Sequence, residues 1–260
     1  MWRIAAFACA LLFLSFESRA LNTWGTDMSD LWWNPAENGW GANVTHQRDT
    51  IFMTLFVYGP DRSARWYSAS DMRGTTTPQG GYVFQGQLFE TTGPHFGGPF
   101  NASAVPRLVG TATLTFPSVE RGTLAYSVDG VSVTKSIERL SMKRAEISGY
   151  YVGGIVGGVS GCGPSTSFAY TGNFTIAMNP SNNNIAMNAT LQNGASCSYI
   201  GTYSQFGRMG AITGTFTCLD TAPGTFTASE IEAGTNMVSM RYVARYGACT
   251  ETGVIGGMKF

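Results

Sequence analysis

The chain carries little charge. Asp, Glu, Lys and Arg make up only 12% of its 260 residues, about half the usual share. Acidic and basic residues balance at 16 each, so no basic excess points to a nucleic acid partner. There are only two histidines, and no cysteine pair has the spacing of a zinc or redox motif. The sequence therefore predicts no metal site and no cofactor.

The only long apolar run is at the N-terminus. There the basic Arg3 precedes Ile4–Phe16, and Ser18 and Ala20 are the small residues that a signal peptidase reads. We predict a signal peptide at residues 1–20, cleaved after Ala20. The run is too short for a comfortable membrane span, so we expect an exported protein, secreted or periplasmic, without a helical membrane anchor.

The abundant residue types, glycine and the aromatic residues, favour an all-β fold. The chain holds 33 glycines and 13% aromatic residues, and its apolar residues alternate with polar ones over many short stretches. No stretch has a convincing helical period. We predict antiparallel meander strands forming two small barrels or sandwiches, with one continuous meander as the alternative. The charged segment 138–147 divides the chain into a Trp-rich β domain, 21–145, and a disulfide-braced β domain, 146–260.

The second domain holds all four cysteines outside the signal peptide, an even number that is typical of disulfides in an oxidising compartment. Two predicted strands flank a short turn there, and their hairpin register places Cys197 opposite Cys218. Facing residues of a hairpin lie close enough for a disulfide. The remaining pair, Cys162 and Cys249, would then join the start of this domain to its end.

Tryptophan is concentrated near the start of the first domain. Five of the six tryptophans lie between residues 24 and 66. Residues 21–38 are expected to be irregular. Alternating and apolar stretches then predict strands at 39–47, 51–58 and 65–72.

Two simple hairpins would join these strands. A three-residue turn at 48–50 pairs His46 with Phe52, and the next turn pairs Phe56 with Trp66. With this register, these four residues and Trp40 would share one face of a three-stranded sheet.

Trp and Tyr present rigid apolar surfaces with a polar edge, which suit sugar rings and flat apolar ligands. We therefore predict a non-catalytic binding protein for a small-molecule or carbohydrate ligand. Core packing is the competing interpretation of Trp40, Phe56 and Trp66. The candidate ligand-binding residues are Trp32, Trp33, Asn34, Glu37, Trp40, His46 and Trp66.

Two other classes stay open. A hydrolase of a cell-wall or extracellular polymer could use Glu37 with His46 or His95, although no spacing singles these residues out. An envelope or outer-membrane structural component is the third interpretation, because the terminal Phe260 resembles the end of bacterial outer-membrane barrels. Short, Gly-interrupted strands and two disulfides argue against a membrane partner. The sequence does not indicate the oligomeric state.

One segment resembles a known motif. Trp32-Trp33-Asn34-Pro35-Ala36-Glu37-Asn38-Gly39-Trp40-Gly41 is similar to Trp-Trp-Asn-Pro-x-Glu-Ser-Gly-Trp-Gly, which is found in uncharacterised bacterial exported proteins. Asn38 stands where that family has Ser. The resemblance extends over about forty residues, through the Trp-containing strand that follows. It implies a bacterial source and an exported β protein, and it implies no activity.

Overall fold

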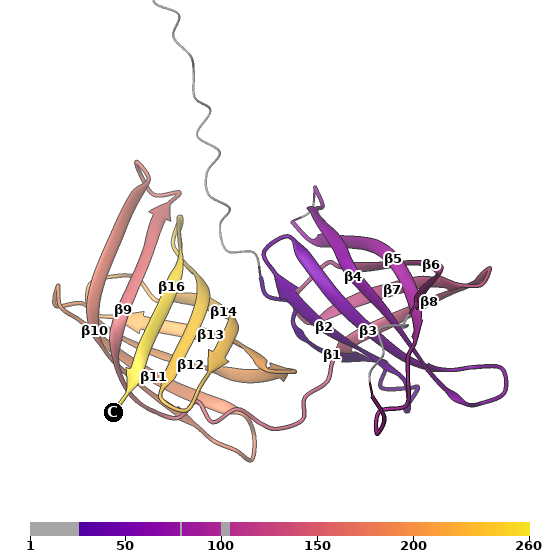
Figure 1. Ribbon diagram of the computed structural model, residues 1–260. Helices are drawn as coiled ribbons and strands as arrows, with labels where there is room; N and C mark the ends of the chain where they lie inside the picture. The colour runs from indigo at the N-terminus through magenta and orange to yellow at the C-terminus, as the bar shows by residue number, and fades with distance from the viewer. Residues whose placement is uncertain (1–25, 79, 100–104) are drawn as a thin grey trace, which may run out of the picture.

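The structure, a computed structural model, describes residues 26–78, 80–99 and 105–260. Every regular element in those residues is a β-strand, and the strands form two closed antiparallel barrels of eight strands each, lying side by side (Figure 1). The predicted all-β fold is thereby confirmed. The predicted signal peptide, 1–20, lies outside the described residues. Within the described ranges, no helix is long and apolar enough to cross a membrane.

The first barrel lies within the predicted domain 21–145, and each strand pairs with the next one along the chain. Its strands are β1 (Asp30–Trp33), β2 (Gly41–Gln47), β3 (Thr50–Tyr58), β4 (Ala64–Thr76), β5 (Tyr82–Thr92), β6 (Val105–Phe116), β7 (Arg121–Val128) and β8 (Val131–Arg139). Pairing of Trp32 with Arg139 closes the barrel between β1 and β8. The expectation that residues 21–38 are irregular was wrong for β1, because four residues are too few to show a period.

The second barrel lies within the predicted domain 146–260, and β16 returns to pair with β9. Its strands are β9 (Gly149–Ser160), β10 (Thr166–Met178), β11 (Asn184–Leu191), β12 (Ser196–Phe206), β13 (Met209–Cys218), β14 (Gly224–Ala233), β15 (Met237–Tyr246) and β16 (Cys249–Lys259). Four glycines interrupt β9, so its sequence shows no alternation of large apolar residues.

Both barrels are built by side chains that alternate between the interior and the surface. Large side chains fill the first interior, where Trp32, Phe84 and Phe116 are each no more than 1% exposed. The second interior combines aromatic rings with inward glycines. A Cβ added to Gly257, for example, would lie 2.8 Å from the Phe174 ring. Glycine at such positions lets rings lie directly against the backbone.

The predicted disulfides are present in the second barrel. Cys197 faces Cys218 across the β12–β13 hairpin, in the register expected from the sequence, and the two are bonded. Cys162 is bonded to Cys249, which joins the β9–β10 turn to the start of β16 across 87 residues of chain. Both bonds brace the same end of the barrel, since all four cysteines lie at or beside its hairpin turns.

The register of the β2–β3 hairpin differs from the prediction by one residue. Gln47 pairs with Thr50, so the turn has two residues and His46 faces Ile51 instead of Phe52. A shift of one residue moves every side chain to the opposite face. The β3–β4 register was right where Phe56 faces Trp66.

Hydrogen bonds and an ion pair join the two barrels in addition to the connecting residues 140–148. The β12–β13 turn of the second barrel lies against the base of the first. The Arg208 backbone N–H donates to Asp30 Oδ2 at 3.1 Å, and the Arg208 guanidinium pairs with Asp27 at 2.5 Å. In addition, the Gly207 N–H donates to Ser141 Oγ at 2.8 Å. These contacts fix the turn between the barrels.

Candidate functional site

An aromatic patch lies on the outer wall of the first barrel. Gly41 of β2 lies between Trp33 of β1 and Phe56 of β3, and Phe56 in turn pairs with Trp66 of β4. The row thus crosses four strands. Phe56 and Trp66 are 50% and 49% exposed. Because Gly41 has no side chain, the row has a gap beside Phe56. We call this row, together with the exposed Phe52, the aromatic wall.

Uncharged polar groups lie within the aromatic wall. Asn43 pairs with Thr54, and Thr54 pairs with Ser68, which forms a row between Phe52 and the Phe56–Trp66 pair. No outward position of Gly41–Gln47 or Thr50–Tyr58 holds a charged residue. The wall therefore offers flat apolar rings beside amide and hydroxyl groups, with no charge at its centre.

The turn before β2 is held by two of the predicted site residues. Asn34 Oδ1 accepts the Ala36 N–H at 2.9 Å. Glu37 accepts the Trp40 indole N–H at 2.9 Å and pairs with Lys135 Nζ at 2.8 Å. The hydrogen bond from Lys135 lowers the pKa of Glu37 most, and the hydrogen bond from Trp40 lowers it further. Both polar side chains thus have partners within the turn and support the edge of the aromatic wall.

Three predicted site residues face the other way. Trp32 is 1% exposed, and its indole N–H donates to the Met28 carbonyl at 3.0 Å. Trp40 packs against the core, and the His46 side chain is 5% exposed. The prediction that Trp40 and His46 share a face with Phe56 and Trp66 was therefore wrong. The β2–β3 register shift places Trp40 and His46 on the inner side, so they cannot contact a ligand on the aromatic wall.

The groups considered for hydrolysis are not joined by their contacts. Glu37 pairs with Lys135, and His46 Nδ1 accepts the Met28 N–H at 3.2 Å inside the barrel. His95 lies in a loop with its ring 4.6 Å from that of Phe96. Within the described residues, no group of three or more His, Cys, Asp or Glu could hold a metal ion.

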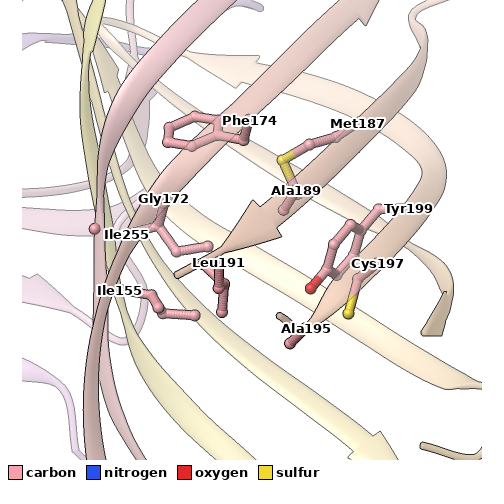
Figure 2. Close-up of a pocket in the computed structure, with 11 residues that line it drawn as sticks. Ile155, Gly172, Phe174, Met187, Ala189, Leu191, Ala195, Cys197, Tyr199 and Ile255 are labelled. Atoms are coloured by element: carbon pink, nitrogen blue, oxygen red, sulfur yellow. The ribbon is translucent and has the colours of Figure 1, made fainter. Parts of the chain in front are cut away.

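A second candidate site lies inside the second barrel, where an apolar pocket is present at its disulfide-braced end. Figure 2 shows side chains from β9, β10, β11 and β12 around the pocket, with the Tyr199 ring along one side. The cavity volume is about 40 Å³, and the hollow measures about 470 Å³ when the open solvent at its mouth is included. The lining side chains include Ile155, Phe174, Met187, Ala189, Leu191 and Tyr199.

One carboxylate lies among tyrosines at this end of the barrel. The Tyr242 hydroxyl donates to Glu251 Oε1 at 2.5 Å. Burial is the main cause that raises the pKa of Tyr199 to about 12, and the negative charge of Glu251 is the second cause. The same two causes raise the pKa of Tyr246. Among the described residues, Glu251 forms no ion pair with Lys, Arg or His. The carboxylate therefore lacks a cationic partner.

Sequence reasoning missed this pocket because its signal is weak. The inward positions of β10 continue as Phe168, Tyr170, Gly172 and Phe174, so the alternation was recognised but the missing side chain at Gly172 was not. Glu251 is also inward, and the next inward positions of its strand are Gly253, Ile255 and Gly257. An inward acidic residue beside inward glycines was the available clue.

Comparison with known proteins adds little. No protein-family profile matches the chain, and no curated protein does. Among solved structures, the transferrin-binding protein B of Neisseria meningitidis is 11% identical, with a TM-score of 0.35, over 89% of this chain and 69% of that one. A putative outer membrane protein of Bacteroides fragilis is 14% identical, with a TM-score of 0.31, over 84% of this chain and 94% of that one. A Nostoc punctiforme protein of unknown function is 9% identical, with a TM-score of 0.28, over 89% and 94%. Likenesses this weak carry no inference about this chain.

Proposed function

We propose that this chain is an exported, non-catalytic binding protein whose aromatic wall binds a neutral carbohydrate. The observation that carries the proposal is the half-exposed Phe56–Trp66 pair on the outer face of β3 and β4. Two large, half-exposed rings on neighbouring paired strands form an apolar surface. Such a surface is suited to the C–H face of a sugar ring.

The neighbouring groups support a neutral ligand. Asn43, Thr54 and Ser68 supply donors and acceptors that can hydrogen-bond sugar hydroxyls beside the rings. An anionic or cationic ligand would find no opposite charge at the outward positions of β2 and β3, and the exposed Asp71 and Arg73 on β4 pair with each other at 2.7 Å. The wall therefore favours an uncharged glycan over an ionic partner.

Export has independent support. The two disulfides are typical of proteins from an oxidising compartment. The resemblance of Trp32–Gly41 to bacterial exported proteins points the same way, and we propose that this chain is related to them. An exported protein meets envelope and extracellular polysaccharides, which are the ligands considered for the wall.

The test is binding of the oxidised protein to a panel of neutral and charged polysaccharides, read out by affinity electrophoresis and Trp fluorescence. We expect binding to at least one neutral glycan. Trp66→Ala and Phe56→Ala should each weaken it at least tenfold without lowering the melting temperature. The matched control is Tyr150→Ala, which removes a 44% exposed aromatic residue from the second barrel and should leave binding unchanged.

Two results would contradict the proposal. One is the absence of binding to every neutral glycan on the panel. The other is glycan binding that Trp66→Ala and Phe56→Ala leave intact, which would place the ligand elsewhere on the molecule.

A further inference from the structure

We propose a second, independent site in the mouth of the second barrel, which binds an amphiphile with an unbranched alkyl body and a cationic amine head. The alkyl body would occupy the apolar pocket, and the head would lie against Glu251. This proposal does not depend on carbohydrate binding by the first barrel.

The pocket results from small inward residues. Eight-stranded barrels are just wide enough for side chains to fill them or for one small ligand. On β10 and β11, Gly172 and Ala189 line the pocket where larger residues would close it, and Ala195 lines it beside the β11–β12 turn. The walls are aliphatic and aromatic (Figure 2), and the space is open to solvent. A narrow apolar space of this kind suits an alkyl chain better than a bulky ring system.

The opposite end of the barrel is closed. Ile147 is fully buried beneath it, and the Tyr151 hydroxyl donates to the Ile147 carbonyl at 2.8 Å. Both disulfides lie at the open end and restrain its hairpins. A ligand would therefore enter from one side, into a mouth whose strands are already held in place. A preformed site of this kind costs less ordering on binding.

The polar groups at the mouth select the head group. Glu251 lies near the start of β16, and Tyr199 and Tyr246 lie at the same end on β12 and β15. The Tyr199 ring both lines the pocket and is close enough to Glu251 to interact with its charge. A carboxylate attracts ammonium groups through its charge, and neighbouring aromatic rings can add cation–π contact. The same carboxylate repels an anionic head.

The ring arrangement is rigid. Tyr199 stacks on Phe216 with ring centroids 5.6 Å apart and packs edge-on against Phe226 at 5.1 Å. Phe216 in turn contacts Tyr246 at 6.0 Å. These contacts hold the aromatic side of the mouth without help from a ligand. One Glu251 oxygen accepts the Tyr242 hydroxyl, and its other oxygen has no hydrogen bond within the described residues.

The experiment is isothermal titration of the full, oxidised protein with three probes. Octyltrimethylammonium has both body and head, tetramethylammonium has only the head, and octanoate has a similar body with an anionic head. We expect octyltrimethylammonium to bind at least tenfold more tightly than either of the others. Binding should also change the near-UV signal of the tyrosines, since residues 148–260 contain no Trp.

Variants separate the two parts of the site. Glu251→Gln keeps an acceptor for Tyr242 and should weaken octyltrimethylammonium binding at least fivefold without weakening octanoate binding. Asp220→Asn removes an exposed charge from the turn after β13 at the same end and should have no effect. Ala189→Leu should fill the pocket and weaken the binding tenfold. Ala195→Leu should likewise fill the pocket beside the β11–β12 turn and weaken the binding, and it serves as the test if Ala189→Leu does not fold.

The proposal is overturned if octyltrimethylammonium binds no more tightly than tetramethylammonium or octanoate. It is also overturned if Glu251→Gln leaves the affinity for octyltrimethylammonium unchanged. The same holds if every folded variant among Ala189→Leu and Ala195→Leu leaves this affinity unchanged. Trp66→Ala should leave amine binding intact, so failure of the carbohydrate proposal and failure of this one can be distinguished.

Discussion

Arg139 should be the most important charged residue for the stability of the first barrel. Its side chain is fully buried and pairs with Asp30 at 3.0 Å, and Asp30 is itself only 9% exposed. The guanidinium also donates to the carbonyls of Asp27 at 2.7 Å and Val119 at 2.5 Å. It lies 4.8 Å from the centre of the Trp32 ring. One residue thus ties the N-terminal segment, β1 and the β6–β7 turn together.

Substitution of Arg139 by Met keeps much of the side-chain volume but leaves the Asp30 carboxylate and several carbonyls without this partner. Breaking a buried ion pair by removing one member costs about 3–5 kcal/mol. With an m-value of about 2 kcal/mol/M, the urea midpoint should fall by about 2 M. Asp30 retains the Arg208 backbone N–H, so we expect a loss nearer the lower limit.

Trp fluorescence measures this transition selectively, because every Trp in the described residues belongs to the first barrel. Arg107→Met is the matched control. It removes an exposed Arg that pairs with Glu90 and Asp129, and the midpoint should hardly change. A loss of less than about 1 kcal/mol for Arg139→Met would refute the reasoning, since a desolvated pair cannot be removed at that cost.

Three further outcomes are expected. Replacing Cys162 and Cys249 by Ser should lower the stability of the second barrel by about 4–5 kcal/mol in the chain-entropy model, seen in near-UV circular dichroism with the Trp transition unchanged. Gly207→Ala should lower the melting temperature and weaken the junction, because Gly207 has φ +58° and a Cβ there would lie 2.2 Å from the Asp30 carboxylate. Burial would raise the pKa of Asp27, but hydrogen bonds from Ser29 and the Arg208 charge outweigh it, so the pKa is lowered. The stabilisation by the Asp27 carboxylate is therefore complete above the pKa of Asp27 in the unfolded chain, and it should be lost as the pH falls below about 4. Urea unfolding at several pH values would show this loss, because the difference in unfolding free energy between the wild type and Arg208→Ala should become smaller at low pH.

Much of the fold follows from short-range patterns. The alternation of apolar residues from Phe168 to Met178 predicts β10, and a short turn fixes the hairpin that brings Cys197 to Cys218. Such features depend on period and turn length, which are visible in one sequence. The second disulfide then follows by elimination. Closure of each barrel does not follow, because a first strand paired with a last one has no local signal.

The aromatic wall was harder to predict, because the assignment of its residues to one face depended on the length of the β2–β3 turn. A three-residue turn was expected between β2 and β3, but Arg48 adopts φ +58° and the turn has two residues. Positive φ is uncommon for Arg, so nothing in the local sequence favours this conformation. The error reversed the face assigned to His46 and left the Phe56–Trp66 pair correct. Trp33 and Trp66 are outside, whereas Trp32 is in the core.

The two barrels have the same number of strands, so their interiors differ mainly in which residues fill them. In the first, Trp32, Phe84 and Phe116 pack together at ring distances of 4.6 Å and 6.2 Å, which leaves the outer wall as the place for a ligand. In the second, inward glycines and alanines leave a pocket at one end. The tryptophan cluster, the strongest feature of the sequence, therefore identifies the barrel with the filled core. An open apolar space is found where large residues are missing, and filling it at Ala189 is the change that most directly tests whether the space has a function.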